Sequence, residues 1–188
     1  MGTAPAQPGR GWQNLGEAAV VDTPWFQLKL AQVALPGRGT IDHYLLRLPP
    51  VVLTTLLDEQ DRVLLLWRHR FIPDSWGWEL PSGIATDPAE DLADVACRQA
   101  LAESGWQPIA PRPLLTLEPY SSLTDSVCHV FWTERAVFRG EPTAAFEAER
   151  IEWVPLSDVP ALVADGQIKA ASTAAALLHL CCGRAIRG

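Results

Sequence analysis

Backbone groups and a carboxylate that could act on a phosphate are close together in one stretch of this sequence. The segment 78–83 (WELPSG) indicates a strand that ends in a glycine loop, and the helix predicted after it carries Glu103. A strand, a loop and a helix in this order can direct backbone N–H groups and acidic side chains at one metal–phosphate site. We therefore expect Ser82 and Gly83 to contact a substrate.

Basic side chains end a second predicted strand. Arg68, His69 and Arg70 follow an apolar run and alternate between the two faces of that strand. A guanidinium there could bind a phosphate or a sugar carboxylate, or it could be a solvated charge at a strand end. We predict Arg68 and Arg70 as substrate-binding residues.

The apolar pattern predicts the elements that position these groups. Nearly continuous apolar runs such as VLLLW indicate strands that are buried on two faces. Strands are expected over 25–35, 41–48, 51–57, 62–71, 114–118, 126–133 and 151–154. A helix is predicted from Asp87, as N-cap with Glu90 completing a capping box, to Ser104, with Gly105 as its stop. With further helices over 155–165 and 168–182, this order predicts an α/β fold, a mixed sheet between helices (α/β/α).

Composition narrows the class of protein. The 188 residues carry a net charge of −7, which disfavours long nucleic acids as partners. No apolar run reaches the roughly 20 residues of a membrane span, and the first ten residues lack the apolar core of a signal peptide. The four cysteines lack metal-site spacing, and we expect free thiols. A cytoplasmic protein is predicted, with no membrane partner.

The charged helix and its lead-in resemble the Nudix hydrolase family, in particular its ADP-ribose pyrophosphatase branch. The family box is G-x5-E-x7-R-E-U-x-E-E-x-G-U, with U a bulky apolar residue. Here Gly83 is followed by six residues rather than five before Glu90, and Arg98 and Gly105 then follow in register. The segments WRHRF, WELPSG, LTDS at 123–126 and FEAERIEWVP at 146–155 extend the resemblance. It implies the Nudix fold, with Glu90, Arg98 and Gly105 supporting the box.

Two of the three glutamates that bind metal in this family are replaced. Positions 99, 102 and 103 share one helix face, and they hold Gln99, Ala102 and Glu103. The resemblance implies a weakened Mg²⁺ or Mn²⁺ site formed by Glu103, Gln99 and the Ser82 carbonyl. Fewer carboxylates should lower both metal occupancy and hydrolytic rate.

Three other acids are candidates for a catalytic role beside Glu103 and Gln99. In the ADP-ribose branch a glutamate beyond the last strands of the sheet can position water, and Glu147 or Glu149 lies in the matching stretch. Asp125 lies in the loop that covers substrate in that branch. Each of these could also be a surface or turn-capping charge.

Three functions remain open at this point. The first is weak or atypical metal-dependent hydrolysis of a nucleoside diphosphate linked to another moiety, of the ADP-ribose or nucleotide-sugar type. The second is a non-hydrolytic enzyme that reuses the pocket for acid–base chemistry, and the third is an inactive nucleotide-binding module. The predicted organisation is a mobile arm over 1–24, a β segment over 25–49 that forms a homodimer, and a Nudix domain over 50–188.

Overall fold

The computed structural model describes residues 11–185. The chain divides into two compact units. The first comprises the residues up to Pro49 together with Tyr120–Ser126, and the second comprises Pro50–Pro119 and the residues from Val127 onward. The boundary after Pro49 lies within the Pro49-Pro50 pair, which separates one strand from the next.

The first unit is a three-stranded antiparallel sheet in the order β1-β2-β3. Its strands are β1 (Gln13–Asp22), β2 (Gln27–Leu35) and β3 (Gly39–Arg47). The segment 120–126 belongs to this unit. The Leu46 N–H donates to the Leu123 carbonyl at 2.8 Å, and Arg47 contacts Asp125 at 2.7 Å.

The prediction of an arm over 1–24 is wrong for residues 13–22, which form β1. Nine of the ten side chains of this strand are exposed, so its sequence shows no alternation of apolar and polar residues. Two register shifts against β2 disturb the pattern further. Residues 1–10 lie outside the described part of the chain.

The second unit contains a four-stranded mixed sheet, a three-stranded sheet and a two-stranded sheet. The mixed sheet has the order β7-β4-β10-β9, with β4 and β10 parallel and the other pairs antiparallel. Its strands are β4 (Val51–Leu56), β7 (Ser82–Ile84), β9 (Arg112–Leu117) and β10 (Cys128–Thr133). The antiparallel sheet β12-β5-β6 contains β5 (Arg62–Arg70), β6 (Ser75–Glu79) and β12 (Arg150–Pro155). The third pairs β8 (Trp106–Pro108) with β11 (Ala136–Phe138).

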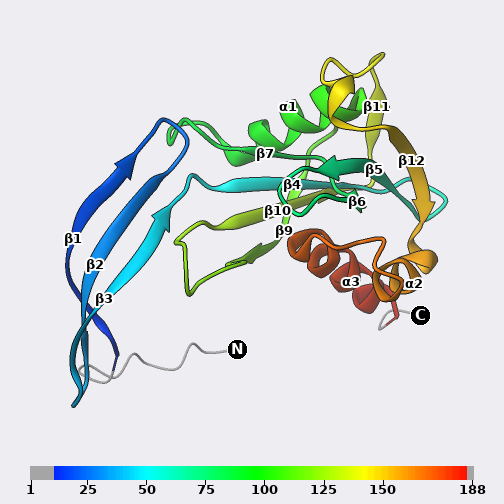
Figure 1. Ribbon diagram of the computed structural model, residues 1–188. Coiled ribbons are helices and arrows are strands. Elements are labelled where there is room, and N and C mark those ends of the chain that lie inside the picture. Colours follow the sequence, from blue (N-terminus) through cyan, green and yellow to red (C-terminus); the bar gives the residue numbers. More distant parts are fainter. Residues whose placement is uncertain (1–10, 186–188) are drawn as a thin grey trace. The chain divides into compact units, whose positions relative to one another are not determined.

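Helices cover both faces of the mixed sheet, as Figure 1 shows for this unit. They are α1 (Leu92–Ser104), α2 (Val159–Ala164) and α3 (Ala171–Ala185), with one-turn 3₁₀ helices η1 (Ala145–Glu147) and η2 (Leu156–Asp158). The predicted α/β arrangement with a mixed sheet between helices is confirmed. No helix among the described residues is long and apolar enough to cross a membrane.

Strand β4 shows why the apolar runs are continuous. Val52 packs in a cluster with Val95 and Ala96 of α1, whereas Leu53 packs in a cluster with Leu177 of α3. Thr54 also faces α1, because its hydroxyl donates to the Ala96 carbonyl at 3.1 Å. Alternate side chains therefore enter two different cores, which is why apolar residues follow one another along this strand.

Helix α1 begins one turn later than the sequence predicts. Asp91, not Asp87, is its N-cap, and the Asp91 carboxylate accepts from the Ala93 N–H at 2.8 Å. Asp87 instead closes a separate turn, because its carboxylate accepts from the Ala89 N–H at 2.8 Å. The predicted end is confirmed: Gly105 has the left-handed φ of 75°, which favours glycine.

Candidate active site

Two elements carry the central charged residues of the second unit. Along β5, the apolar side chain of Leu64 packs toward Ala100 of α1. Side chains two residues apart on a strand share a face, so Arg68 and Arg70 lie on this same side. On α1, Gln99 and Glu103 are four residues apart and share one helix face. The strand thus brings two cations to the face of α1 that carries the box residues.

Arg68 and Glu103 form a buried ion pair. Arg68 Nη2 lies 2.8 Å from Glu103 Oε2, and the two side chains are only 2% and 4% exposed. The Ser82 N–H donates to the same carboxylate oxygen at 3.0 Å. Burial raises the pKa of the Glu103 carboxyl above its ordinary value, against the lowering effect of Arg68 and of the Ser82 N–H.

Glu147 connects this pair to the surface. Its Oε2 lies 3.7 Å from Arg68 Nη1, and its side chain is 38% exposed. Two backbone hydrogen bonds of 2.9 Å place the segment that carries it: the Ala144 N–H donates to the carbonyl of Ala102, and the Glu149 N–H donates to that of Trp67. The first bond docks the segment on α1 at the position where the family has a glutamate.

A second ion pair lies on the same face of β5. Arg70 donates from Nε to Glu79 Oε1 at 3.0 Å and from Nη2 to Glu79 Oε2 at 2.5 Å. These hydrogen bonds raise the pKa of Arg70, and the charges of Glu103 and Glu147 add to the effect. Arg70 is therefore electrostatically coupled to the buried pair.

A cleft of about 410 Å³ opens beside these charges. Its lining combines an arginine, two carboxylates and aromatic rings: His69, Arg70, Trp76, Ala145, Phe146, Glu147, Ala148 and Glu149. The His69 and Trp76 rings are 5.2 Å apart, and Trp76 is 43% exposed. The cleft thus offers an aromatic face together with a guanidinium, a group that binds phosphate well.

The residues present do not fit the divalent metal site that the resemblance implies. Glu103 already contacts a guanidinium, Gln99 is neutral and Ala102 has no donor atom in its side chain. Within residues 11–185, no group of three or more His, Cys, Asp or Glu side chains is placed to hold a metal ion. Metal ligation by Glu103, Gln99 and Ser82 stays a prediction that these contacts do not favour.

Gln99 has a packing role. A Cβ added to Gly83 would overlap Gln99 Cδ and Cγ and would lie 2.6 Å from its Nε2. The amide side chain therefore fills the space beside the Gly83 backbone. The predicted substrate contact of Gly83 stays a prediction.

The remaining predicted residues have other partners. Glu90 and Arg98 form a hydrogen-bonded ion pair, with both Glu90 oxygens 2.8 Å from Arg98 Nη2. This pair takes the place of the expected capping box. Asp125 pairs with Arg47 in the first unit. A catalytic role for Asp125 stays a prediction.

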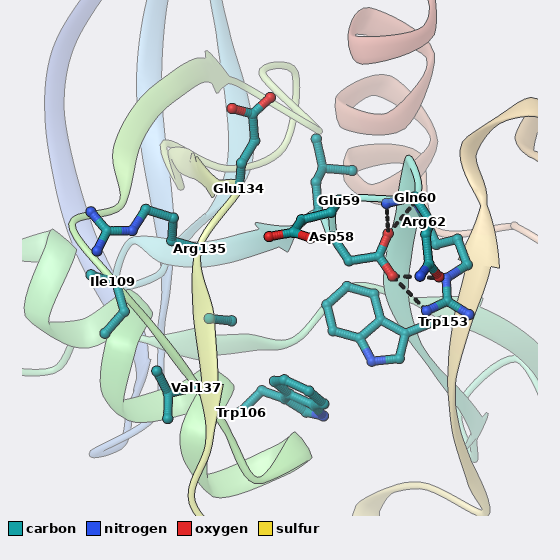
Figure 2. A pocket seen from close by; sticks show the side chains of 12 residues that line it. Asp58, Glu59, Gln60, Arg62, Trp106, Ile109, Glu134, Arg135, Val137 and Trp153 are labelled. Atoms are coloured by element: carbon teal, nitrogen blue, oxygen red, sulfur yellow. Dashed lines mark hydrogen bonds and ion pairs between the residues drawn. The ribbon is translucent and has the colours of Figure 1, made fainter.

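A second cleft, of about 420 Å³, lies in the same unit (Figure 2). Figure 2 shows Asp58 hydrogen-bonded to Gln60 and Arg62, with the Trp106 and Trp153 side chains also lining the cleft. Asp58 accepts from the Arg62 Nε at 2.7 Å. This cleft also carries charges, since Glu59, Glu134 and Arg135 line it beside the Asp58–Arg62 pair. None of the residues predicted for the site lines it, whereas Arg70, Glu147 and Glu149 line the first cleft, which makes the second cleft the weaker candidate.

The sequence alone did not reveal that Arg68 and Glu103 are partners. The available signal was the position of Arg68 directly after an apolar run that is buried on two faces. A charge in such a position is buried and needs a partner of opposite charge. The partner comes from another element 35 residues later, and helix periodicity does not identify it.

Comparisons with known proteins agree with this fold. Residues 47–176 match the family model of the NUDIX domain. The CMP-5'-(N-acetyl-N-hydroxy-3-aminopropyl)phosphonate hydrolase of Streptomyces rubellomurinus is 38% identical over 167 residues, covering 89% of this chain and 81% of that protein. The crystal structure of an ADP compounds hydrolase superposes with a TM-score of 0.77 at 16% identity, covering 97% of this chain and 99% of that one.

Proposed function

This chain belongs to the NUDIX domain family and is a hydrolase of that family, and we propose that it cleaves a nucleotide joined through a phosphoanhydride to a second moiety. The second moiety is a phosphorylated or phosphonylated group, as in ADP-ribose, nucleotide sugars or CMP-linked phosphonates. The relative that is 38% identical acts on a CMP-linked phosphonate, which supports the last of these classes.

The observation that carries this proposal is the cleft beside the Arg68–Glu103–Glu147 chain of charges. A nucleotide needs a flat apolar surface for its base and cations for its phosphates. Trp76 supplies the first and Arg70 the second. Arg70 uses Nε and Nη2 on Glu79, which leaves the N–H groups of Nη1 for a phosphate oxygen.

Glu149 is the residue that we assign as general base. It lines the cleft, and within the described residues its carboxylate has no cationic partner, whereas Glu147 contacts Arg68. The water oxygen would attack one phosphorus atom while Glu149 accepts a proton. The bond from that phosphorus to the bridging oxygen would break, releasing a nucleoside monophosphate and the second phosphate or phosphonate.

The test is product formation by the Glu149→Gln variant. We expect kcat to fall by about 10²-fold or more, because a positioned base contributes on that order, with a small change in KM. ADP-ribose, a nucleotide sugar and a CMP-linked phosphonate are incubated with wild-type and variant protein, and products are separated by chromatography.

Glu141→Gln is the matched control, because Glu141 is exposed, precedes η1 in the same loop and does not line the cleft. It should retain the wild-type rate. Equal rates for Glu149→Gln and wild type would refute the assignment of the base. Absence of product from all three substrate classes would refute the proposed function.

We also propose that the chain forms a homodimer through the first unit. In that unit, Trp25 is 71% exposed and Tyr44 is 56% exposed. Exposed aromatic residues on a small sheet are typical of a surface that binds a partner.

A cytoplasmic location is proposed as well. It is supported by four free cysteines, since unpaired thiols are typical of reducing compartments. Recovery of the protein from a secreted or periplasmic fraction would contradict this location.

A further inference from the structure

The charge that faces Glu103 in this chain is a guanidinium. Hydrolases of this family generally use divalent metals such as Mg²⁺. Resting on the proposed function, we propose that Arg68 is the resident cation of this site, and that its pairing with Glu103 replaces a protein-bound divalent ion there.

Burial fixes Arg68 in this position. The side chain is 2% exposed, and a buried charge is very unfavourable without a partner of opposite charge. A divalent ion that took Glu103 would leave Arg68 paired only with Glu147 at 3.7 Å, a partner that is itself 38% exposed. Entry of a metal ion at Glu103 is therefore opposed by the loss of a buried ion pair.

The rest of the site agrees with a fixed cation. Positions 99 and 102, which share the Glu103 face, contribute no negative charge. The carbonyl of Ala102 accepts from Ala144, so the segment that carries Glu147 occupies this side of the helix. One buried cation between Glu103 and Glu147 needs no further carboxylate, whereas a pair of divalent ions would.

The two carboxylates do not satisfy the whole Arg68 guanidinium. Its Nε is buried and has no hydrogen-bond partner among the described residues. Buried N–H groups are nearly always satisfied, so a partner absent from the protein atoms is expected here.

The test is a titration of the free, full-length protein with Mn²⁺. The electron paramagnetic resonance signal of unbound Mn²⁺ reports how much of the ion is bound. Wild type should show no Mn²⁺ binding that depends on Glu103, so wild type and Glu103→Gln should give the same titration. The triple variant Arg68→Gln/Gln99→Glu/Ala102→Glu should gain affinity by about tenfold or more, because three carboxylates then face one point without a competing cation.

Saturable Mn²⁺ binding by wild type with a Kd below about 100 µM that is weakened by Glu103→Gln would overturn the inference. If wild type shows no saturable Mn²⁺ binding in this range, the inference is supported without any variant. A metal requirement in catalysis without metal binding to the free protein would support it, because the ion then arrives on the substrate. Hydrolysis that persists in chelator would also support it.

This outcome is separable from that of the proposed function. If no substrate is hydrolysed, the proposed function falls, and the Mn²⁺ titration still reports on Arg68. If substrates are hydrolysed and wild type binds Mn²⁺ through Glu103, the function stands and the role of Arg68 falls.

Discussion

Position 83 favours glycine because the Gln99 side chain occupies the space that a Cβ at position 83 would need. In Gly83→Ala, the flexible amide of Gln99 must move away. Overpacking of this kind typically costs about 1–3 kcal/mol, and we expect a loss of unfolding free energy in this range. Urea titration of the single variant measures it.

The double variant Gly83→Ala/Gln99→Ala provides the control for this contact. If the clash is with Gln99, shortening that side chain should recover most of the lost stability in a double-mutant cycle. Equal losses in the presence and absence of Gln99→Ala would show that the two positions are independent.

Asp58 makes the unfolding free energy of the protein vary with pH in the acidic range. Burial raises the pKa of its carboxyl, but hydrogen bonds from the Arg62 backbone, the Arg62 guanidinium and the Gln60 N–H outweigh this, so the pKa lies below its ordinary value of 3.8. A carboxyl with a lowered pKa in the folded state stabilises it above the ordinary value. This stabilisation is lost as the pH falls through the lowered value.

We therefore expect Asp58→Asn to be less stable than wild type at neutral pH, with the difference shrinking toward about pH 3. Chemical denaturation at both pH values measures it. A difference that stays constant with pH would mean that the Asp58 charge plays no part and that the substitution acts only through packing.

At the scale of elements, the cap of helix α1 can be tested with two similar aspartates. Asp87 and Asp91 each accept one backbone N–H at 2.8 Å, but only Asp91 caps the helix. Asp91→Ala should cost about 1 kcal/mol of unfolding free energy, as is usual for an N-cap. Asp87→Ala should cost less than about 0.5 kcal/mol.

Thermal or urea unfolding of Asp87→Ala and Asp91→Ala, measured in parallel, shows which aspartate is the N-cap. If Asp87→Ala were the more damaging substitution, the helix would begin where the capping-box pattern predicts. That outcome would contradict the assignment of Asp91 as the N-cap.

Long apolar strands and the central helix could be predicted from the sequence because their burial is nearly uniform. The strand at 51–57 and the stop at Gly105 are examples, since each depends on neighbouring residues only. No strand is predicted for residues 75–77, which belong to β6, or for residues 13–22, which form β1. Both depend on pairing with another strand, which a local pattern does not contain.

The candidate site followed the same rule. The box residues could be identified from the family resemblance, because the order of Glu90, Arg98 and Gly105 is local in the sequence. The Arg68–Glu103 pair joins a strand to a helix, and Glu147 comes from a third segment. Such a charge network depends on the packed fold, so sequence spacing gave candidates for it but no partners.

At the scale of the whole molecule, the homodimer proposal predicts the mass in solution. In the first unit, nine of ten side chains of β1 are exposed, and Ala31 is the one buried residue of β2. A small sheet with so little core gains stability from a partner. We expect light scattering with size-exclusion chromatography to give twice the chain mass.

The double variant Trp25→Ser/Tyr44→Ser should shift the mass toward one chain, whereas Phe71→Ser should not. Phe71 is 82% exposed and lies in the second unit, which makes it a matched control for lost aromatic surface. A single-chain mass for wild type would refute the dimer.

The first unit is completed by residues that are synthesised late. His43 contacts the Ser122 carbonyl 79 residues further along the chain, and β4 must pair with β10, where Val51 is opposite Cys128. Contacts between residues so distant in sequence form slowly, because a long loop has to close first. On the ribosome, the edge of β3 and one edge of β4 therefore stay unpaired until the chain has grown past residue 120. Both sheets are then completed within a few residues of synthesis. Before that point, the unpaired strand edges make the nascent chain most prone to aggregation and most in need of a chaperone.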